Sequence, residues 1–390
     1  VRWSLSGKHE GWGMFDEPSG AEVYIMGFTH AEFGPYGLRK EFTLFDPSFN
    51  LETNIYAKIN FILVKKGELM SQLDIESRII RYGELIPCKT AFIDAHTPGS
   101  DQKENFTIIG AGVSESPDQH VHLALPHGFN IGAAGQPPKC RNSLHSHRTA
   151  EVFFVLKGRW RFFWGRWGTA GEVVLQEGDI INIPTGIFRG FENIGNDYGM
   201  IMAILGGDDA GGGVIWAPQV LEDAKNHGLV LSEKGKLYDT KKGESLPDNI
   251  NPMPSLTEKE LSEFPELKGD DIIANHVARY LDLLSLSKDN PAKVIGEKAK
   301  LVDKPGFEVE FISRNSLSNT SQKSNKINVL MPVKGHWKFF SNTFKTVLNP
   351  GDTFSVPEDL DYTLEPSMTG ESGLYRVIPT DDPAGATWRP

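Results

Sequence analysis

The chain has 390 residues, of which 39% are hydrophobic and 10% aromatic, and its formal net charge is −11 at pH 7. This length exceeds the usual single domain, so we expect two globular domains with connecting segments. The acidic charge argues against nucleic acid or an anionic membrane as the main partner, and no apolar run approaches the ~20 residues that cross a bilayer.

Cysteine usage indicates the redox environment. Cys88 and Cys140 are the two cysteines of the chain. They are too few for a disulfide framework, which suits a reducing cytoplasm, and we expect a cytoplasmic protein. Neither lies in a recognisable activation context, so both are expected to be small buried residues.

Residues 1–100 are interpreted as a β-rich N-terminal extension. Three stretches there read as strands, at 21–28, 58–70 and 78–87. No motif assigns this part of the chain a function. It could be an extra subdomain or an arm that pairs with a β-barrel formed by later residues.

Short β-rich segments dominate residues 101–215, where Gly, Pro and Asn punctuate them at close intervals. This pattern is typical of a compact antiparallel barrel or sandwich. Residues 216–292 come next as a helical connector. A short amphipathic helix is expected to end at Gly228, a capping box of Thr257 and Glu260 opens a second, and residues 271–286 have apolar side chains at helical spacing.

An internal repeat relates the central region to residues 293–390. "KGRWRFF" at 157–163 recurs as "KGHWKFF" at 334–340, and "LQEGDIINIP" at 175–184 recurs as "LNPGDTFSVP" at 348–357. Both pairs occur in the same order. The sequence therefore predicts a duplicated β-unit.

The stretch "HSHRTAEVFFVLKG" at 145–158 has the side chains of a metal site. Residues i and i+2 of a strand face the same way, so His145 and His147 can point together into a barrel, and a short turn can bring Glu151 towards them. Two imidazoles and a carboxylate are typical of non-haem Fe(II) sites, although Zn, Mn, Ni or Cu could be held as well.

The whole pattern resembles the cupin superfamily, and the duplication resembles a bicupin. The first cupin motif, G-x5-H-x-H-x3,4-E-x6-G, is matched at His145, His147, Glu151 and Gly158, with Lys139 in place of the leading glycine. The second motif, G-x5-P-x-G-x2-H-x3-N, is matched at Gly178, Pro184, Gly186 and Asn193. The resemblance implies an all-β fold with two jelly-roll-like cupin barrels, and it covers about 140–195 strongly and about 305–380 weakly.

The second motif departs from the family at its histidine, which is Arg189 here. A guanidinium has no lone pair to offer a metal. Three arrangements are open: a three-ligand site with Arg189 binding an anionic substrate, a site completed by His120 or His122, or a metal-free site with Glu151 paired to Arg189. In the second copy Gln322, Ser324, Asn328 and Tyr362 occupy the ligand positions, so that copy is expected to be a scaffold.

Aromatic side chains near the motifs suggest a substrate pocket. Trp160 and Phe162 share one face of an expected strand, and His120 and His122 share one face of another. Rings of this kind suit a flat organic substrate, although ordinary core packing also accounts for them.

The leading hypothesis is an Fe(II) dioxygenase that acts on a small oxygenated acid, aromatic acids included, in a homo-oligomer. The layout is similar to gentisate-type ring-cleaving dioxygenases, except that those enzymes commonly use three histidines. The first alternative is a metal-dependent lyase, isomerase or decarboxylase, in which the ion polarises a carbonyl or carboxylate. The second alternative is a metal-free bicupin that only binds its ligand.

Overall fold

The computed structural model describes residues 75–208, 213–301, 306–316, 322–323, 325–367 and 369–381, together with three strands nearer the N-terminus. The chain divides into two compact units, Val1–Asp74 and Ile75–Pro390. The first unit contains an antiparallel sheet of β1 (Arg2–Lys8), β2 (Glu22–Gly34) and β3 (Gly37–Phe45), in that order. The strand expected at 21–28 falls in β2, whereas the strand expected at 58–70 lies outside the described residues.

Two sheets form the first β-unit of Ile75–Pro390. The larger sheet has the strand order β18 (Val277–Ala278), β12 (Ile180–Ile183), β9 (Glu151–Lys157), β14 (Gly199–Gly206), β7 (Phe129–Gln136), β5 (Glu104–Ile109) and β6 (Val121–Leu123). The smaller sheet has the order β11 (Gly171–Leu175), β10 (Trp160–Trp164), β13 (Arg189–Asn193), β8 (Arg141–Ser146) and β15 (Ile215–Trp216). Alternation along β10 buries Trp160, Phe162 and Trp164 between the sheets.

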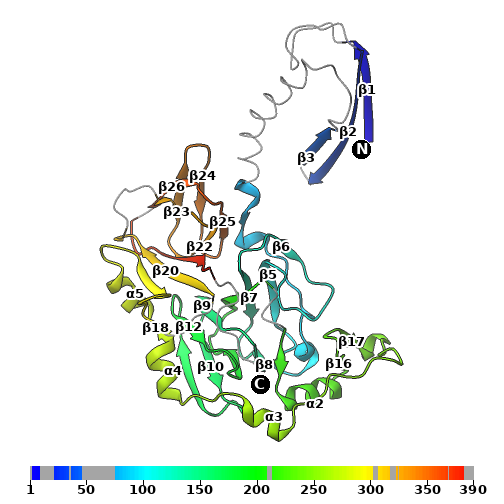
Figure 1. Ribbon diagram of the computed structural model, residues 1–390, viewed down its shortest axis with the longest axis vertical. Helices are drawn as coiled ribbons and strands as arrows, with labels where there is room; N and C mark the ends of the chain where they lie inside the picture. The colour runs from blue at the N-terminus through cyan, green and yellow to red at the C-terminus, as the bar shows by residue number, and fades with distance from the viewer. Residues whose placement is uncertain are drawn as a thin grey trace. The chain divides into compact units, whose positions relative to one another are not determined.

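The second β-unit repeats the first. Its larger sheet has the order β19 (Ala292–Ile295), β20 (Phe307–Ser313), β27 (Gly373–Pro379), β22 (Asn328–Lys334), β25 (Thr353–Val356) and β4 (Ile79–Ile80). Its smaller sheet has the order β21 (Gln322–Lys323), β26 (Asp361–Pro366), β23 (Trp337–Ser341) and β24 (Lys345–Leu348). The two β-units lie side by side within Ile75–Pro390 (Figure 1). The predicted all-β fold with two jelly-roll units is confirmed, as pairs of packed sheets rather than closed barrels.

The two β-units exchange their edge strands. β4 precedes the first unit in the chain but pairs with β25 of the second, whereas β18 precedes the second unit but pairs with β12 of the first. Residues 75–100, which the sequence analysis assigned to the N-terminal extension, thus belong to the same compact unit as both pairs of sheets.

The connector is only partly helical. It contains α2 (Pro218–Asn226), α3 (Glu258–Glu263), α4 (Gly269–His276) and α5 (Tyr280–Leu286), with a hairpin of β16 (Leu229–Leu231) and β17 (Leu237–Asp239). The capping box of Thr257 and Glu260 is confirmed. The continuous helix expected from the spacing over 271–286 is wrong, because β18 interrupts it to complete the sheet beside β12.

A shared apolar core joins the two units. It includes Phe129 and Phe154 from the first unit and Phe307 and Tyr375 from the second. The Tyr375 ring lies 4.8 Å from that of Phe154, and its hydroxyl donates to the Gly178 carbonyl at 2.7 Å. Packing of this kind makes one body from two sheet pairs.

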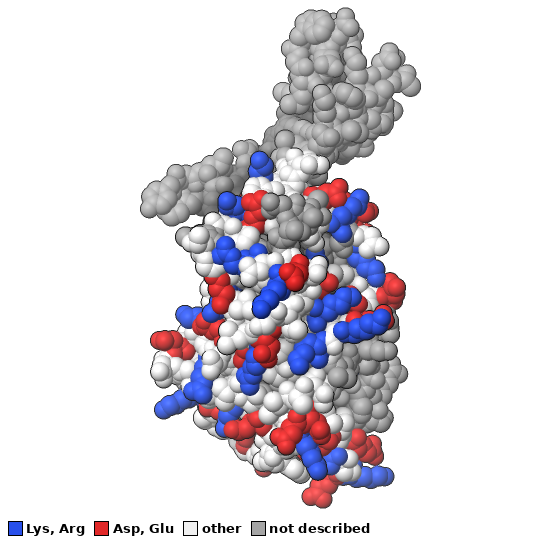
Figure 2. Space-filling view, turned by 90° about the vertical axis from the view of Figure 1, so that its left-hand side faces the viewer, with Lys and Arg blue, Asp and Glu red and all other residues white. Residues whose placement is uncertain are grey.

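On the surface, acidic and basic side chains are intermingled over the face shown in Figure 2. Within the described part of the chain, none of the helices has the length and apolar character of a bilayer span.

Candidate metal centre

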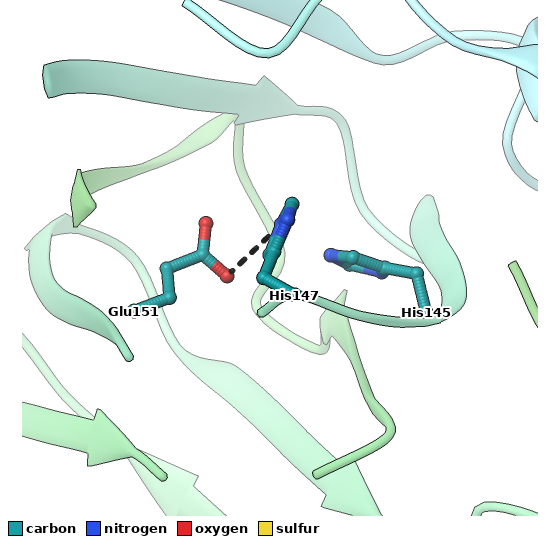
Figure 3. A group of neighbouring side chains, drawn as sticks. All are labelled: His145, His147 and Glu151. Carbon is teal, nitrogen blue, oxygen red and sulfur yellow. Dashed lines mark ion pairs between the residues drawn. The ribbon is translucent and has the colours of Figure 1, made fainter. Parts of the chain in front are cut away.

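The three side chains of the first motif converge between the two sheets. His145 lies near the end of β8, His147 comes directly after that strand, and Glu151 opens β9. All three are buried, and one ligand atom from each lies within 4.8 Å of the others. Figure 3 shows the two imidazoles and the carboxylate directed towards a common point, where the Nε2 of His147 is 3.8 Å from Oε2 of Glu151.

Backbone carbonyls fix the orientation of both imidazoles. The Nδ1 of His145 lies 2.7 Å from the carbonyl of Ser143, and the Nδ1 of His147 lies 2.9 Å from the carbonyl of Gly213. A carbonyl can only accept, so each ring carries its proton on Nδ1 and presents the Nε2 lone pair. This arrangement is typical of metal-ligating histidines.

Burial keeps both imidazoles neutral. It lowers the pKa of His145 and of His147 well below the usual value of 6.5, and the nearby Arg189 guanidinium lowers both further. Neutral imidazole is the form that binds a metal, so neither ring has to release a proton near neutral pH. The donor set therefore fits a divalent transition metal.

Arg189 occupies the place of the missing histidine and pairs with Glu151. It opens β13, opposite His145 in the sheet, and is 1% exposed. Its Nη2 and Nε both donate to Oε2 of Glu151, at 2.5 and 3.1 Å, so Oε1 takes no part in the ion pair. Burial raises the pKa of Glu151 and lowers that of Arg189, while each charge opposes the effect on its partner.

This ion pair was the arrangement expected for a metal-free site, and the structure also keeps the three ligand atoms together. The carboxylate oxygen 3.8 Å from Nε2 of His147, Oε2, is the one that accepts from Arg189, whereas Oε1 has no contact with the guanidinium. The structure thus combines a metal-binding group with a buried cation beside it.

A cavity of about 70 Å³ opens beside these side chains. His145, His147 and Glu151 line it on one side, together with Asn142. The rest of its wall is mainly apolar and comes from both sheets and the segments before them; it includes Phe92, Phe106, Ile131, Ala133, Phe153, Phe191, Leu205 and Trp216.

The other residues of the expected pocket lie elsewhere. Trp160 and Phe162 are 0% exposed and pack in the core rather than in the cavity wall. His120 precedes β6 and His122 lies in it, at the edge of the larger sheet, where His122 is held by the Thr107 carbonyl and the Ile86 N–H. Neither belongs to the metal-binding group, because the sheet edge lies outside the cavity.

Trp216 also belongs to the site, although no motif of the sequence predicted it. Its ring lies 5.5 Å from that of His145, and its indole N–H donates to Glu115 at 2.6 Å. Glu115 also accepts from the Ile93 N–H, and burial raises the pKa of its carboxyl to about 7. Trp216 reaches the site because β15 pairs with β8, a contact between strands that no local motif announces.

The second β-unit has a different cluster at the equivalent place. Tyr362 stands at the position of Arg189, and its hydroxyl lies 3.4 Å from Oδ1 of Asn328, at the position of Glu151. Arg376 pairs with Glu310 nearby. Within the described residues, the group of potential metal ligands lies in the first β-unit.

Comparison with known proteins gives a family for the first β-unit. Residues 135–205 match the family model described as "Cupin domain". None of the curated proteins compared with this sequence matches it.

Among solved structures, the oxalate decarboxylase of Lactobacillus farciminis in complex with formate is similar at 12% identity, with a TM-score of 0.47 over 79% of this chain and 87% of that one. Vicilin from Capsicum annuum is similar at 12% identity, with a TM-score of 0.41 over 77% of this chain and 85% of that one. A cupin 2 conserved barrel domain protein from Leptotrichia buccalis is similar at 10% identity, with a TM-score of 0.35 over 66% of this chain and 86% of that one.

The matched segment begins in β7 and ends in β14, and so contains both motifs and the four side chains of the site. The metal-binding group, the strand order and the family match agree with one another. Residues 135–205 are therefore identified as a cupin domain.

Proposed function

We propose that this protein is a metal-dependent enzyme that acts on a small aliphatic carboxylic acid. The observation that carries the proposal is the convergence of two oriented, neutral imidazoles and a carboxylate on one cavity. A divalent metal bound there would supply Lewis-acid or redox chemistry at the cavity wall. His145, His147 and Glu151 would hold it, and Arg189 would bind the acid.

The charges of the site favour an anionic substrate. Arg189 and Glu151 cancel one another, so a divalent ion would leave two uncompensated positive charges in a buried place. Uncompensated buried charge is costly. A carboxylate bound to the ion would reduce this cost. To bind the carboxylate as well, Arg189 would redirect donors that now contact Glu151 and the carbonyls of His145 and Ile187.

The volume of the cavity favours a small substrate. The cavity measures about 70 Å³, whereas a cavity of ~150 Å³ accommodates a benzene ring. An aromatic acid, which the sequence analysis included, would not fit beside the ligands without rearrangement. An acid of a few carbon atoms would fill the space and displace its water.

The same volume favours a non-oxidative reaction, such as that of a lyase or decarboxylase, over the dioxygenase reaction. A dioxygenase needs room for dioxygen next to its substrate, and a cavity of about 70 Å³ offers less room for two reactants than for one small acid. Of the metals considered for the site, Mn, Zn, Ni or Cu could support a non-oxidative reaction as well as Fe.

The test is turnover with separately reconstituted metals. Protein loaded with Mn, Fe, Zn or Co is incubated with mono- and dicarboxylic acids of two to five carbons and with aromatic acids, while NMR monitors products and an electrode monitors oxygen. We expect an aliphatic acid to be converted without oxygen uptake. Stoichiometric oxygen uptake would indicate a dioxygenase instead of a non-oxidative enzyme. The absence of turnover with every metal would contradict the proposal that the protein is an enzyme.

Arg189→Lys tests the binding of the acid. Lysine retains the charge but cannot form the two-pronged contact with a carboxylate. We expect metal content close to that of the native protein and a higher KM for the acid. Loss of the metal in this variant would show instead that Arg189 supports Glu151 as a ligand.

A metal-free binding protein is the second candidate, and the Glu151–Arg189 ion pair favours it. In that protein the two charges compensate each other and the cavity binds an acid without converting it. Protein purified after growth in medium supplemented with iron, manganese and zinc would then contain no stoichiometric metal.

Both cysteines support the expectation of a reducing compartment. Cys88 and Cys140 are free and buried. We propose a cytoplasmic location on this basis.

A further inference from the structure

A fully buried ion pair lies behind the candidate metal centre. Asp94, in the short helix Ile93–His96, and Lys103, just before β5, form this pair, and both side chains are 0% exposed. Burial of an ion pair has a large desolvation cost, and apolar residues of similar volume often stabilise a core better. Stability alone therefore does not explain why the two charges are there.

The pair is connected to His145 through one residue, Ser143. Oδ1 of Asp94 accepts from Lys103, and Oδ2 accepts the N–H of Ser143 at 3.1 Å. The carbonyl of Ser143 is the group that holds Nδ1 of His145 at 2.7 Å. Lys103 also donates to Oδ1 of Asn142, the residue before Ser143, at 2.9 Å.

Ser143 lies in a β-bulge. In the pairing of β8 with β13, His145 stands opposite Arg189 and Asn142 opposite Phe191, so Ser143 and Leu144 together face Gly190. A bulge disrupts the ladder of backbone hydrogen bonds and changes the direction of the side chains beside it. A buried N–H without an acceptor is costly, and Asp94 supplies the acceptor for Ser143 inside the bulge.

We propose that Asp94, held in place by Lys103, is a positioning residue for His145. It stabilises the bulge whose carbonyl fixes the imidazole, so that Nε2 faces His147 and Glu151. The inference rests on the proposed metal centre for its functional meaning. The chain of hydrogen bonds itself involves only residues of this protein.

The decisive variant is Asp94→Leu/Lys103→Met, because it removes both charges together and leaves neither unpaired in the core. We expect it to fold, and we expect its dissociation constant for Co²⁺ to rise ~10–100-fold, the range found when an outer partner of a metal ligand is removed. Co²⁺ titration monitored by visible absorption gives the constant, and circular dichroism checks the fold.

Two matched variants control for general damage to the core. Asp94→Asn/Lys103→Met removes the charges but keeps an acceptor oxygen for Ser143, and should retain Co²⁺ affinity within about threefold. Glu310→Leu/Arg376→Met removes a partly buried ion pair of the second β-unit, and should leave Co²⁺ affinity unchanged.

A second measurement does not depend on a metal. In the metal-free protein, ¹⁵N NMR of the His145 ring reports which nitrogen carries the proton. We expect the Nδ1–H form alone in the native protein and in Asp94→Asn/Lys103→Met, and a mixture of both forms in Asp94→Leu/Lys103→Met.

The outcomes separate this inference from the proposed function. If the folded Leu/Met variant keeps native Co²⁺ affinity and a single tautomer, Asp94 does not position His145. The same conclusion holds if the Asn/Met variant folds but loses its affinity, because its acceptor oxygen is intact. The native protein could instead bind no Co²⁺, while the Leu/Met variant alone loses the single Nδ1–H form of His145. Asp94 would then still position His145, but the proposed metal-dependent function would be wrong.

Discussion

His147 is the ligand whose replacement gives the clearest result. Its ring has contacts with the Gly213 carbonyl and with Glu151, and it lines the cavity. We expect His147→Ala to lower metal affinity by more than the ~10–100-fold typical of an outer-shell residue, because a ligand itself is lost. The free energy of unfolding of the metal-free protein should change by no more than about 2 kcal/mol.

The matched control is His127→Ala, which removes another buried histidine. Its Nε2 contacts the Ser355 hydroxyl at 2.7 Å, and it does not line the cavity. This variant should lose stability and keep its metal. Equal metal loss in both variants, measured by elemental analysis, would contradict the assignment of His147.

The contribution of His145 and His147 to the stability of the metal-free protein should fall as the pH drops below about 6.5. Burial lowers the pKa of His145 and His147 well below 6.5, so below that pH the unfolded chain binds more protons than the folded protein. Each histidine then removes up to about 1.4 kcal/mol of stability per pH unit.

Buried carboxyls act in the opposite sense, because burial raises the pKa of Glu115 to about 7 and the folded state then holds the extra proton. Comparison with His147→Gln isolates the histidine. The stability of the native protein relative to this variant, from urea unfolding, should decrease as the pH is lowered from about 7 to about 5. A pH-independent difference would show that His147 is not buried in its neutral form.

The ligands could be predicted from the sequence because they lie close together in the chain. His145, His147 and Glu151 belong to one strand, one turn and the start of the next strand, so period-two geometry is sufficient to bring them together. Trp216 and Asp94 could not be predicted, because each reaches the site through pairing or packing of segments distant in sequence.

Two equivalent sets of hydrogen bonds, each centred on an aspartate, hold the exchanged edge strands. In one, Asp179 accepts from Arg279 at 2.8 Å and from the Tyr280 N–H at 2.9 Å. In the other, Asp352 accepts from Arg81 at 2.7 Å and from the Tyr82 N–H at 3.0 Å. Each aspartate comes directly after the glycine of a repeated Gly-Asp turn, so each β-unit is closed by an Arg-Tyr pair that precedes the other unit in the chain.

Asp179→Ala and Asp352→Ala should each destabilise the protein by about 1–3 kcal/mol, because each leaves a backbone N–H without its acceptor, buried at Tyr280 and partly buried at Tyr82. Arg279→Met should cost about 1 kcal/mol or less, because the arginine is 42% exposed and its ion pair is screened by water. Chemical unfolding of the three variants gives these values. A small effect of Asp352→Ala together with a large effect of Asp179→Ala would show that the two sets of hydrogen bonds are not equivalent.

The duplicated turns were visible in the sequence, but the exchange was not. The repeat of "GD" and the aromatic strands predicted two copies of one β-unit. The dipeptide Arg-Tyr also recurs, at 81–82 and 279–280. A two-residue match is too short to predict an exchange of strands unless the pairing of those strands is known. The interruption of the expected helix by β18 has the same origin, since its partner β12 lies about a hundred residues away.

The exchanged strands and the shared core should make residues 75–390 unfold as one body. Phe129 contacts Phe307 across the two β-units, and His127 contacts Ser355. Calorimetry of the metal-free protein should therefore show a single transition for this unit, with calorimetric and van't Hoff enthalpies that agree. Two well-separated transitions would contradict the exchange.

The overall architecture was predictable from strand patterns and the internal repeat, because both are periodic properties of the chain. The boundary of the N-terminal unit was not, since residues 75–100 contribute β4 and Asp94 to the body that contains both β-units. Their role depends on contacts made far along the chain.

Anomalous diffraction combined with elemental analysis tests the central claim most directly. Crystals of protein grown with iron, manganese and zinc in the medium should contain one metal ion per chain, with a peak ~2.0–2.2 Å from Nε2 of His145, Nε2 of His147 and an oxygen of Glu151. An absence of stoichiometric metal, with Arg189 bound to Glu151 and only water between the imidazoles, would contradict the metal-dependent enzyme and leave the binding protein.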